Sequence, residues 1–216
     1  MHVIYGGTFD PIHHGHLRLA VELRERLGVA EIALMPCHVP PHRDVPGATS
    51  EQRVALLELA IAGEPGLTMD DRELRRDGAS YTAETLRQLR GEIGPDKPLA
   101  IVLGTDSFAG FDRWQEWQRI PELAHIIVVQ RPGPGLVPDG VPARLLKERS
   151  VAQVDALYDA PCGHILQMDP PMLDISATGI RDRILSGHSP RYLLPDSVWQ
   201  EIRRLGLYGA CPDGNF

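Results

Sequence analysis

The chain alternates short apolar runs with longer segments whose apolar residues recur every three to four positions. Short apolar runs that end at glycine, proline or polar clusters are typical of buried strands, whereas the longer spacing is typical of amphipathic helices. The strands that we expect cover residues 2–5, 31–35, 67–69, 99–103, 125–130 and 164–168.

Capping residues mark the helix boundaries. Apolar residues recur at helical spacing over residues 14–27, and Gly28 ends that helix. The other expected helices are one capped by Thr49 with Gln52 and running to Ala62, one capped by Thr82 and running to Arg90, one capped by Ser176 and running to Leu185, and one from Pro195 and Asp196 to Leu205.

The order of these elements predicts the fold class. Strands alternate with helices along nearly the whole chain, which is typical of an α/β fold with a doubly wound, mostly parallel sheet. We expect a single domain over residues 1–208, with a small C-terminal helical part at about 175–208. Residues 209–216 are expected to form a mobile tail.

Composition narrows the class of protein. Of the 216 residues, 43% are hydrophobic, which supports a substantial core, and the net charge of −7 argues against general nucleic-acid binding. Cys37, Cys162 and Cys211 form no CxxC pair and are odd in number, so we expect reduced thiols in a cytoplasmic protein. Residues 1–5 lack the basic start of a signal peptide. No run approaches the roughly 20 apolar residues of a membrane span, so we expect no membrane partner.

A segment rich in glycine and histidine follows the first expected strand. Gly6 and Gly7 let the backbone approach a ligand closely, and free N–H groups at the next helix start favour a phosphate. His13, His14 and His16 add donors, and the outer two lie about one helical turn apart. This pattern predicts an anion site. The alternatives are an ordinary strand-to-helix turn with solvent-facing histidines, or a zinc site, for which no nearby cysteine or carboxylate pattern completes the ligand set.

A second candidate anion site lies near the other end of the chain. Ser176 and Thr178 bring hydroxyls to a helix start, and Arg181 follows about a turn and a half later. Backbone amides, hydroxyls and an arginine together suit phosphate oxygens. Taken alone, the segment also fits a capped helix with one incidental arginine.

Together the two motifs resemble the HxGH nucleotidyltransferase superfamily. The first motif is GGTFDP at 6–11 followed by HHGH at 13–16, and the second is ISATGIR at 175–181, which resembles the superfamily's ISSTxIR. The resemblance implies a Rossmann-like nucleotidyltransferase fold. In this superfamily the two outer motif histidines, here His13 and His16, face the ATP phosphates.

Three further stretches resemble the bacterial nicotinate mononucleotide adenylyltransferases. SYTAETL at 80–86 resembles their SYTxxT segment, and GTDS at 104–107 with Trp114 and Trp117 resembles their GxDS…W segment. MPCHVPPHR at 35–43 resembles their proline-rich substrate loop. The resemblance therefore covers almost the whole chain.

Two departures accompany this resemblance. Related sequences often have Asn where Cys37 or His38 stands, which leaves the polar contacts of the proline-rich loop open. Ala177 replaces a common Ser and so removes one hydroxyl.

The resemblance implies an activity. AMP is transferred from ATP to nicotinate mononucleotide, giving deamido-NAD and pyrophosphate in NAD biosynthesis. The acceptor phosphate, whose second pKa is near 6, is mostly dianionic at neutral pH and attacks the α-phosphate directly, without a general base or a covalent intermediate. Positioning and electrostatic stabilisation then supply the acceleration. Mg²⁺ is expected to be carried mainly by ATP and water, with no metal site built from the protein alone.

The resemblance also implies roles for particular residues. His13 and His16 are the expected catalytic residues, with His16 at the α-phosphate. The expected ATP-binding residues are Gly6, Gly7, Thr8, Phe9, Gly104, Asp106, Ser176, Thr178 and Arg181. The expected acceptor-binding residues are Tyr81, Thr82, Trp114, His42, Arg43 and Arg131. Trp114 can stack on the pyridinium ring, although it also fits an ordinary core tryptophan, and Arg131 also fits a surface arginine.

Two other functions remain open at this point. One is another adenylyltransferase of the superfamily, acting on phosphopantetheine or nicotinamide mononucleotide, although the segments 80–86 and 104–114 argue against phosphopantetheine. The other is a non-catalytic nucleotide sensor, which the retention of both phosphate motifs disfavours. The sequence leaves a homo-oligomer open.

Overall fold

The computed structural model describes residues 1–38, 46–76, 80–130 and 136–211. Within these residues a seven-stranded sheet has the order β3-β2-β1-β4-β5-β7-β6, and neighbouring strands run parallel. The strands are β1 (His2–Gly7), β2 (Ile32–Pro36), β3 (Leu67–Met69), β4 (Leu99–Gly104), β5 (His125–Val129), β6 (Ser150–Val151) and β7 (Ile165–Met168). This confirms the expected doubly wound, parallel sheet.

Helices connect the strands and cover the sheet. The α-helices are α1 (His14–Leu27), α2 (Ser50–Ile61), α3 (Thr82–Ile93), α4 (Thr105–Ala109), α5 (Ile120–Leu123), α6 (Val141–Arg149), α7 (Ala177–Leu185) and α8 (Asp196–Leu205). Short 3₁₀ turns are η1 (Phe111–Arg113), η2 (Trp117–Arg119), η3 (Val154–Leu157) and η4 (Leu207–Gly209).

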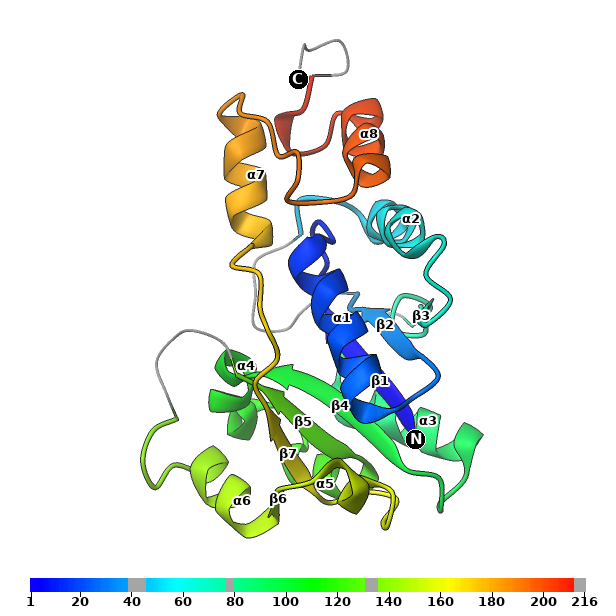
Figure 1. The fold of residues 1–216 in the computed structure, drawn as a ribbon, viewed down its shortest axis with the longest axis vertical. Helices are drawn as coiled ribbons and strands as arrows, with labels where there is room; N and C mark the ends of the chain where they lie inside the picture. Colours follow the sequence, from blue (N-terminus) through cyan, green and yellow to red (C-terminus); the bar gives the residue numbers. More distant parts are fainter. Residues whose placement is uncertain (39–45, 77–79, 131–135, 212–216) are drawn as a thin grey trace.

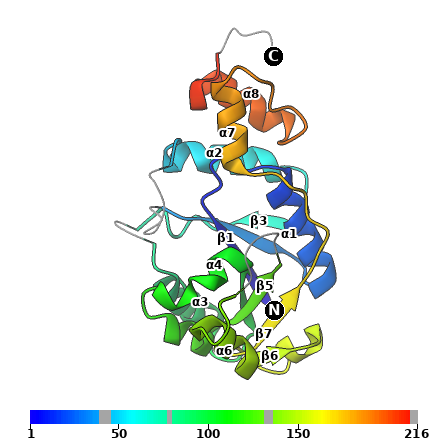
Figure 2. The ribbon, with the colours of Figure 1, turned by 90° about the vertical axis from the view of Figure 1, so that its left-hand side faces the viewer.

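Successive strand residues face opposite sides of the sheet, because side chains alternate along a strand. Val3 and Tyr5 pack into one buried cluster with residues of α1, α2 and α8, whereas Ile4 packs into another with residues of α3, α5 and α6. In the side view of Figure 2 the sheet lies between α1 and α3. The fold therefore has three layers, with apolar cores on both sides of the sheet.

The C-terminal part forms a separate layer above one end of the sheet. α7, α8 and η4 lie beyond α2 (Figure 1), and α2 packs against α8. The expected boundary of the mobile tail at residue 209 does not match the structure, because Gly209 belongs to η4 and Ala210 is buried in the core. Residues 212–216 lie outside the described residues.

Local signals explain which boundaries the sequence predicted correctly. α1 ends where Gly28 adopts a left-handed conformation with φ 65°, and Thr49 with Gln52 forms the expected capping box of α2. The prediction that Thr82 caps a helix to Arg90 was wrong at both ends. Tyr81 is the N-cap residue, without a side-chain cap, and α3 continues to Ile93.

Several short elements were not predicted from the sequence. α4, α5 and α6 are short, and α6 buries only Pro142 and Leu145. A helix with so few buried positions leaves little periodic signal in the sequence.

Candidate active site

The central strands β1 and β4 are neighbours at the point where the strand order reverses. β2 and β3 lie on one side of β1, and β5, β7 and β6 lie on the far side of β4. In open parallel sheets, ligands bind outside the carboxyl ends of the strands at this reversal. Residues 6–11, here called the glycine loop, comprise the last two residues of β1 and the turn that follows at this edge, and Gly104 ends β4 there.

The two glycines of the glycine loop have different surroundings. A Cβ atom on Gly7 would lie 2.8 Å from the Phe9 ring, so glycine leaves room for that ring. A Cβ atom on Gly6 would meet nothing within 4 Å, and Gly6 is exposed. The Phe9 side chain is buried, and its ring contacts Tyr5 and His16 edge to face. The space beside the Gly6 Cα atom is therefore open, whereas the Phe9 side chain packs against His16 from the core.

The two outer histidines of the HHGH segment form a stacked pair. The ring centroids of His13 and His16 lie 3.7 Å apart, with 23° between the ring planes. Gly15 permits this arrangement, because a Cβ atom there would lie 3.0 Å from the His13 ring. His14 lines a separate surface groove that also includes Leu17. The three histidines thus do not converge as zinc ligands would, while the outer two lie together at the start of α1.

The second motif meets the first one directly. Ser176 caps α7 by accepting a hydrogen bond from the Gly179 N–H at 3.1 Å, as expected. Arg181 donates through Nη1 to the Asp10 carbonyl oxygen at 2.7 Å and through Nη2 to Thr178 Oγ1 at 3.2 Å. The fold therefore brings both predicted anion sites, which are far apart in the sequence, to one place.

The Asp10 carboxylate is a buried junction between three parts of the chain. It accepts hydrogen bonds from the N–H groups of Gly47 at 2.8 Å and Ala48 at 3.1 Å, and from the Tyr208 hydroxyl at 2.6 Å. Arg181 lies 3.7 Å from the same carboxylate. Burial and the hydrogen bond to Asp10 raise the pKa of Tyr208, so its hydroxyl remains a donor. The glycine loop is thereby fixed to α7 and η4.

The Arg53 guanidinium is a second buried junction. Its Nη1 donates to the carbonyl oxygens of Thr8 and Cys37, both at 2.8 Å. Its Nη2 donates to the His38 carbonyl oxygen and to Ser50 Oγ, both at 3.1 Å. Arg53 is 1% exposed. It therefore joins the glycine loop to the chain that follows β2.

Neither junction was recognised from the sequence. Arg53 did carry a signal, because it precedes the buried Leu56 and Leu57 by three and four residues and so lies on the buried face of α2. A charged residue on a buried face is unusual enough to indicate a special environment. The contact between Asp10 and Tyr208 has no local signal, since almost the whole chain separates the two residues.

The start of α3 lies beside the end of β2. The His38 N–H donates to Ser80 Oγ at 3.0 Å, and His38 Nδ1 lies 3.0 Å from Ser50 Oγ. Tyr81 and Thr82 follow at the N-terminus of α3. The first N–H groups of a helix have no partner within that helix, so they are available to an anion. Two of the segments expected to bind the acceptor are thus adjacent.

The end of β4 supplies the third segment of the site. Gly104 is the N-cap residue of α4, and Asp106 is exposed in the first turn. Trp114 is half-buried and lies against Phe111, with ring centroids 5.5 Å apart. One part of the Trp114 ring therefore packs against the core, and another part is accessible.

Comparisons with known proteins agree with this geometry. The family model described as cytidylyltransferase-like matches residues 4–183. A probable nicotinate-nucleotide adenylyltransferase of Marinobacter nauticus is 60% identical, over 98% of this chain and 98% of that protein. One of Cellvibrio japonicus is 51% identical, over 95% of this chain and 97% of that protein. The chain belongs to the nicotinate-nucleotide adenylyltransferase family.

A solved structure supports the fold assignment independently. The nicotinic acid mononucleotide adenylyltransferase of Plasmodium falciparum, complexed with NaAD, has a TM-score of 0.73 over 98% of both chains. The two sequences are only 16% identical, so this likeness concerns the architecture. The nucleotidyltransferase fold that was expected from the motifs is confirmed.

Three of the residues expected to bind the acceptor lie outside the described residues, namely His42, Arg43 and Arg131. Within the described ranges, no group of three or more His, Cys, Asp or Glu side chains could hold a metal ion. None of the described helices is long and apolar enough to cross a membrane.

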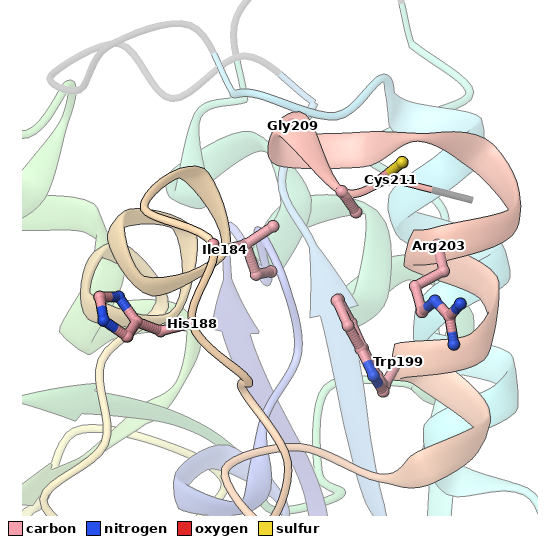
Figure 3. Close-up of a pocket in the computed structure, with 8 residues that line it drawn as sticks. Ile184, His188, Trp199, Arg203, Gly209 and Cys211 are labelled. Atoms are coloured by element: carbon pink, nitrogen blue, oxygen red, sulfur yellow. The ribbon is translucent and has the colours of Figure 1, made fainter. Parts of the chain in front are cut away.

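Two pockets lie away from the candidate active site. One lies between α7, α8 and η4 and is shown in Figure 3, where its lining includes His188, Trp199 and Cys211. The other is the groove beside His14, between α1 and α2. Neither is lined by a residue predicted to bind ATP or the acceptor, so the candidate site rests on its motifs and contacts.

Proposed function

We propose that this protein transfers AMP from ATP to nicotinate mononucleotide, releasing pyrophosphate and giving deamido-NAD. The observation that carries the proposal is the hydrogen bond from Arg181 to the Asp10 carbonyl, which unites the two phosphate motifs beside the stacked His13 and His16. The segments expected to hold the acceptor, at His38 and Tyr81, lie at the same end of the sheet. Identity of 60% to a probable nicotinate-nucleotide adenylyltransferase supports the choice of acceptor.

The reaction needs two anions held in line. A phosphate oxygen of the acceptor attacks the α-phosphorus of ATP and forms a new P–O bond. The bond between the α-phosphorus and the bridging oxygen breaks, and pyrophosphate leaves with that electron pair. Since the nucleophile is already mostly dianionic at neutral pH, no proton need be removed from it. Positioning and charge stabilisation supply the acceleration.

His16 is assigned to the α-phosphate of ATP, and His13 is assigned to an adjacent phosphate group. Their stacked rings at the start of α1 place two donors where the helix N-terminus also favours negative charge. His13 is 3% exposed and the Phe9 ring supports His16, so both rings are held in place before substrate arrives. Donors fixed in advance stabilise developing charge without a cost of reorganisation.

The outer phosphates are assigned to Ser176, Thr178 and Arg181. Arg181 has five N–H donors, so two bonds to the protein leave others for ATP. Mg²⁺ would be held mainly by ATP oxygens and water, neutralising part of their charge. Asp10 is a poor ligand for it because N–H and O–H donors already occupy the carboxylate, whereas Asp106 is exposed and is assigned to ribose hydroxyls.

The acceptor base is assigned to the start of α3 and to Trp114. The nicotinate carboxylate suits the N-terminal N–H groups of α3 at Thr82. The accessible part of the Trp114 ring can stack on the cationic pyridinium. We also infer a cytoplasmic enzyme, since the sequence has an odd number of cysteines and no CxxC pair.

Product analysis tests this function. The purified protein is incubated with ATP, Mg²⁺ and, separately, nicotinate mononucleotide, nicotinamide mononucleotide or phosphopantetheine. We expect deamido-NAD and pyrophosphate in equal amounts with the first acceptor. A different preferred acceptor would replace the proposal by another adenylyltransferase, and no pyrophosphate with any acceptor would indicate a nucleotide sensor.

A further inference from the structure

Arg53 links the two substrate-binding regions through one rigid group. Thr8 belongs to the glycine loop, which is assigned to ATP, whereas Cys37 and His38 begin the segment that is assigned to the acceptor. A single Nη1 atom donates to both Thr8 and Cys37 at 2.8 Å, and Nη2 reaches His38 at 3.1 Å. The backbone supports the same junction, because the Cys37 N–H donates to the Gly7 carbonyl at 3.0 Å.

The chemistry of this junction favours arginine over any other residue. Its acceptors are three carbonyl oxygens and the Ser50 hydroxyl, and none carries a charge. No ion pair involves Arg53 in the part of the chain that the structure describes. A buried charge without a counter-ion costs stability, so four well-directed bonds must offset it. Lysine has three donors on one atom and cannot reproduce the planar fork of the guanidinium.

We propose that Arg53 is a positioning residue of adenylyl transfer, which fixes the glycine loop relative to the start of the acceptor segment. The inference rests on the proposed function. Arg53 is 1% exposed, and its described bonds all go to protein atoms, so it acts through the two backbones and not on the substrates. In-line attack depends on the distance between the two phosphates, and a misplacement of about 1 Å can cost about 10²-fold in rate.

The test compares Arg53→Lys with Arg90→Lys as a matched control. Arg90 also donates from its guanidinium to backbone carbonyls, including those of Leu123 and Pro161, but at the amino end of the sheet. Both substitutions keep the positive charge and replace the planar guanidinium by a single ammonium group. The measurements are melting temperature, the dissociation constant of ATP without acceptor, and kcat with nicotinate mononucleotide.

We expect Arg53→Lys to lower kcat about 10²-fold while ATP affinity changes less than about threefold. Arg90→Lys should lose similar thermal stability and keep kcat near that of the parent protein. A normal kcat in Arg53→Lys would overturn the proposal, and so would an equal loss of kcat in Arg90→Lys. Activity of the parent protein is measured in the same assay, so failure of the proposed function is recognised separately.

A second variant covers the case in which Arg53→Lys does not fold. Ser50→Ala removes one of the four acceptors of the guanidinium and the contact with His38, at the half-buried first residue of α2. A lost hydrogen bond to a charged donor suggests a reduction of kcat of about tenfold. Unchanged kcat in a folded Ser50→Ala protein would contradict the proposal.

Discussion

At the scale of single residues, the site is built from groups that the protein fixes before any substrate binds. The His16 ring is held between the His13 ring and the Phe9 ring, and Arg181 is held by the Asp10 carbonyl and Thr178. The HHGH segment therefore divides into two histidines that stack beside both motifs and one that lines a different groove. This division can be tested directly.

His16→Ala should fold normally and lose about 10²–10³-fold in turnover, which is the effect of removing one preorganised charge-stabilising donor. His14→Ala is the matched control, because His14 lies in the same motif but lines the groove beside Leu17. It should retain turnover close to the parent value. Steady-state kinetics with melting curves provide the measurement, and equal activity of the two variants would refute the assignment.

Arg181→Ala should weaken the use of ATP more than the use of the acceptor. Loss of a charged hydrogen bond suggests an effect of about 1.5–3 kcal/mol. Arg183→Ala is the control, since Arg183 lies on the same helix but donates to the Ser189 carbonyl. Michaelis constants for both substrates check this prediction, and an equal change in the two constants would count against the phosphate role.

At the scale of elements, we propose that the N-terminus of α3 distinguishes the acid from the amide acceptor. Tyr81 caps it without a side-chain hydrogen bond, so the first N–H groups remain for a ligand. A carboxylate only accepts hydrogen bonds, whereas an amide also presents an NH₂ that two N–H groups would oppose. We therefore expect the preference for the acid to depend on the backbone N–H groups of this helix start.

We predict a preference for nicotinate over nicotinamide mononucleotide of up to about 10⁴ in kcat/KM, retained in Thr82→Ala. Trp114→Ala should instead weaken both acceptors to a similar extent, because stacking senses the ring and not its substituent. Kinetics of both acceptors with the three proteins test this. Comparable kcat/KM for acid and amide in the parent protein would remove the basis for the proposal.

The elements differ in how far local sequence determines them. α1 was predicted correctly at its end because Gly28 supplies the left-handed C-cap, and α2 at its start because Thr49 and Gln52 complete a capping box. The start of α3 has no capping side chain, and the sequence misplaced its cap by one residue. The two phosphate motifs were also found from the sequence, because the residues of each lie close together in the chain. Arg53 was missed because it contacts Thr8 and Cys37, which only the folded chain brings beside it.

At the scale of the whole molecule, a buried histidine lies at the amino end of the sheet, opposite the end where the two phosphate motifs meet. His125 at the start of β5 is fully buried, and its Nε2 lies 2.9 Å from the Ala160 carbonyl. Its Nδ1 accepts a hydrogen bond from the His164 N–H at 3.1 Å. Burial lowers the pKa of His125 below its usual value of 6.5. The neutral imidazole is therefore part of the folded structure.

This arrangement predicts an acid-sensitive fold. Between the lowered pKa and 6.5 the unfolded chain binds more protons than the folded one, so stability is complete above about pH 6.5 and falls as the pH drops below it. His125→Asn should show a smaller loss of unfolding free energy between about pH 7.5 and pH 5.5 than the parent protein. Urea titrations at both values measure the difference, and identical losses in the two proteins would exclude His125 as the cause.

The hydrogen bond between Tyr208 and Asp10 spans nearly the full length of the chain. During synthesis the glycine loop leaves the ribosome early, long before Tyr208, which is one of the residues that anchor it. A nascent chain can therefore form much of the sheet while the site at its carboxyl edge is incomplete. The contact that Tyr208 makes would be added only after η4 has been made, so we expect a nascent chain that stops before Tyr208 to hold the Asp10 carboxylate through fewer hydrogen bonds.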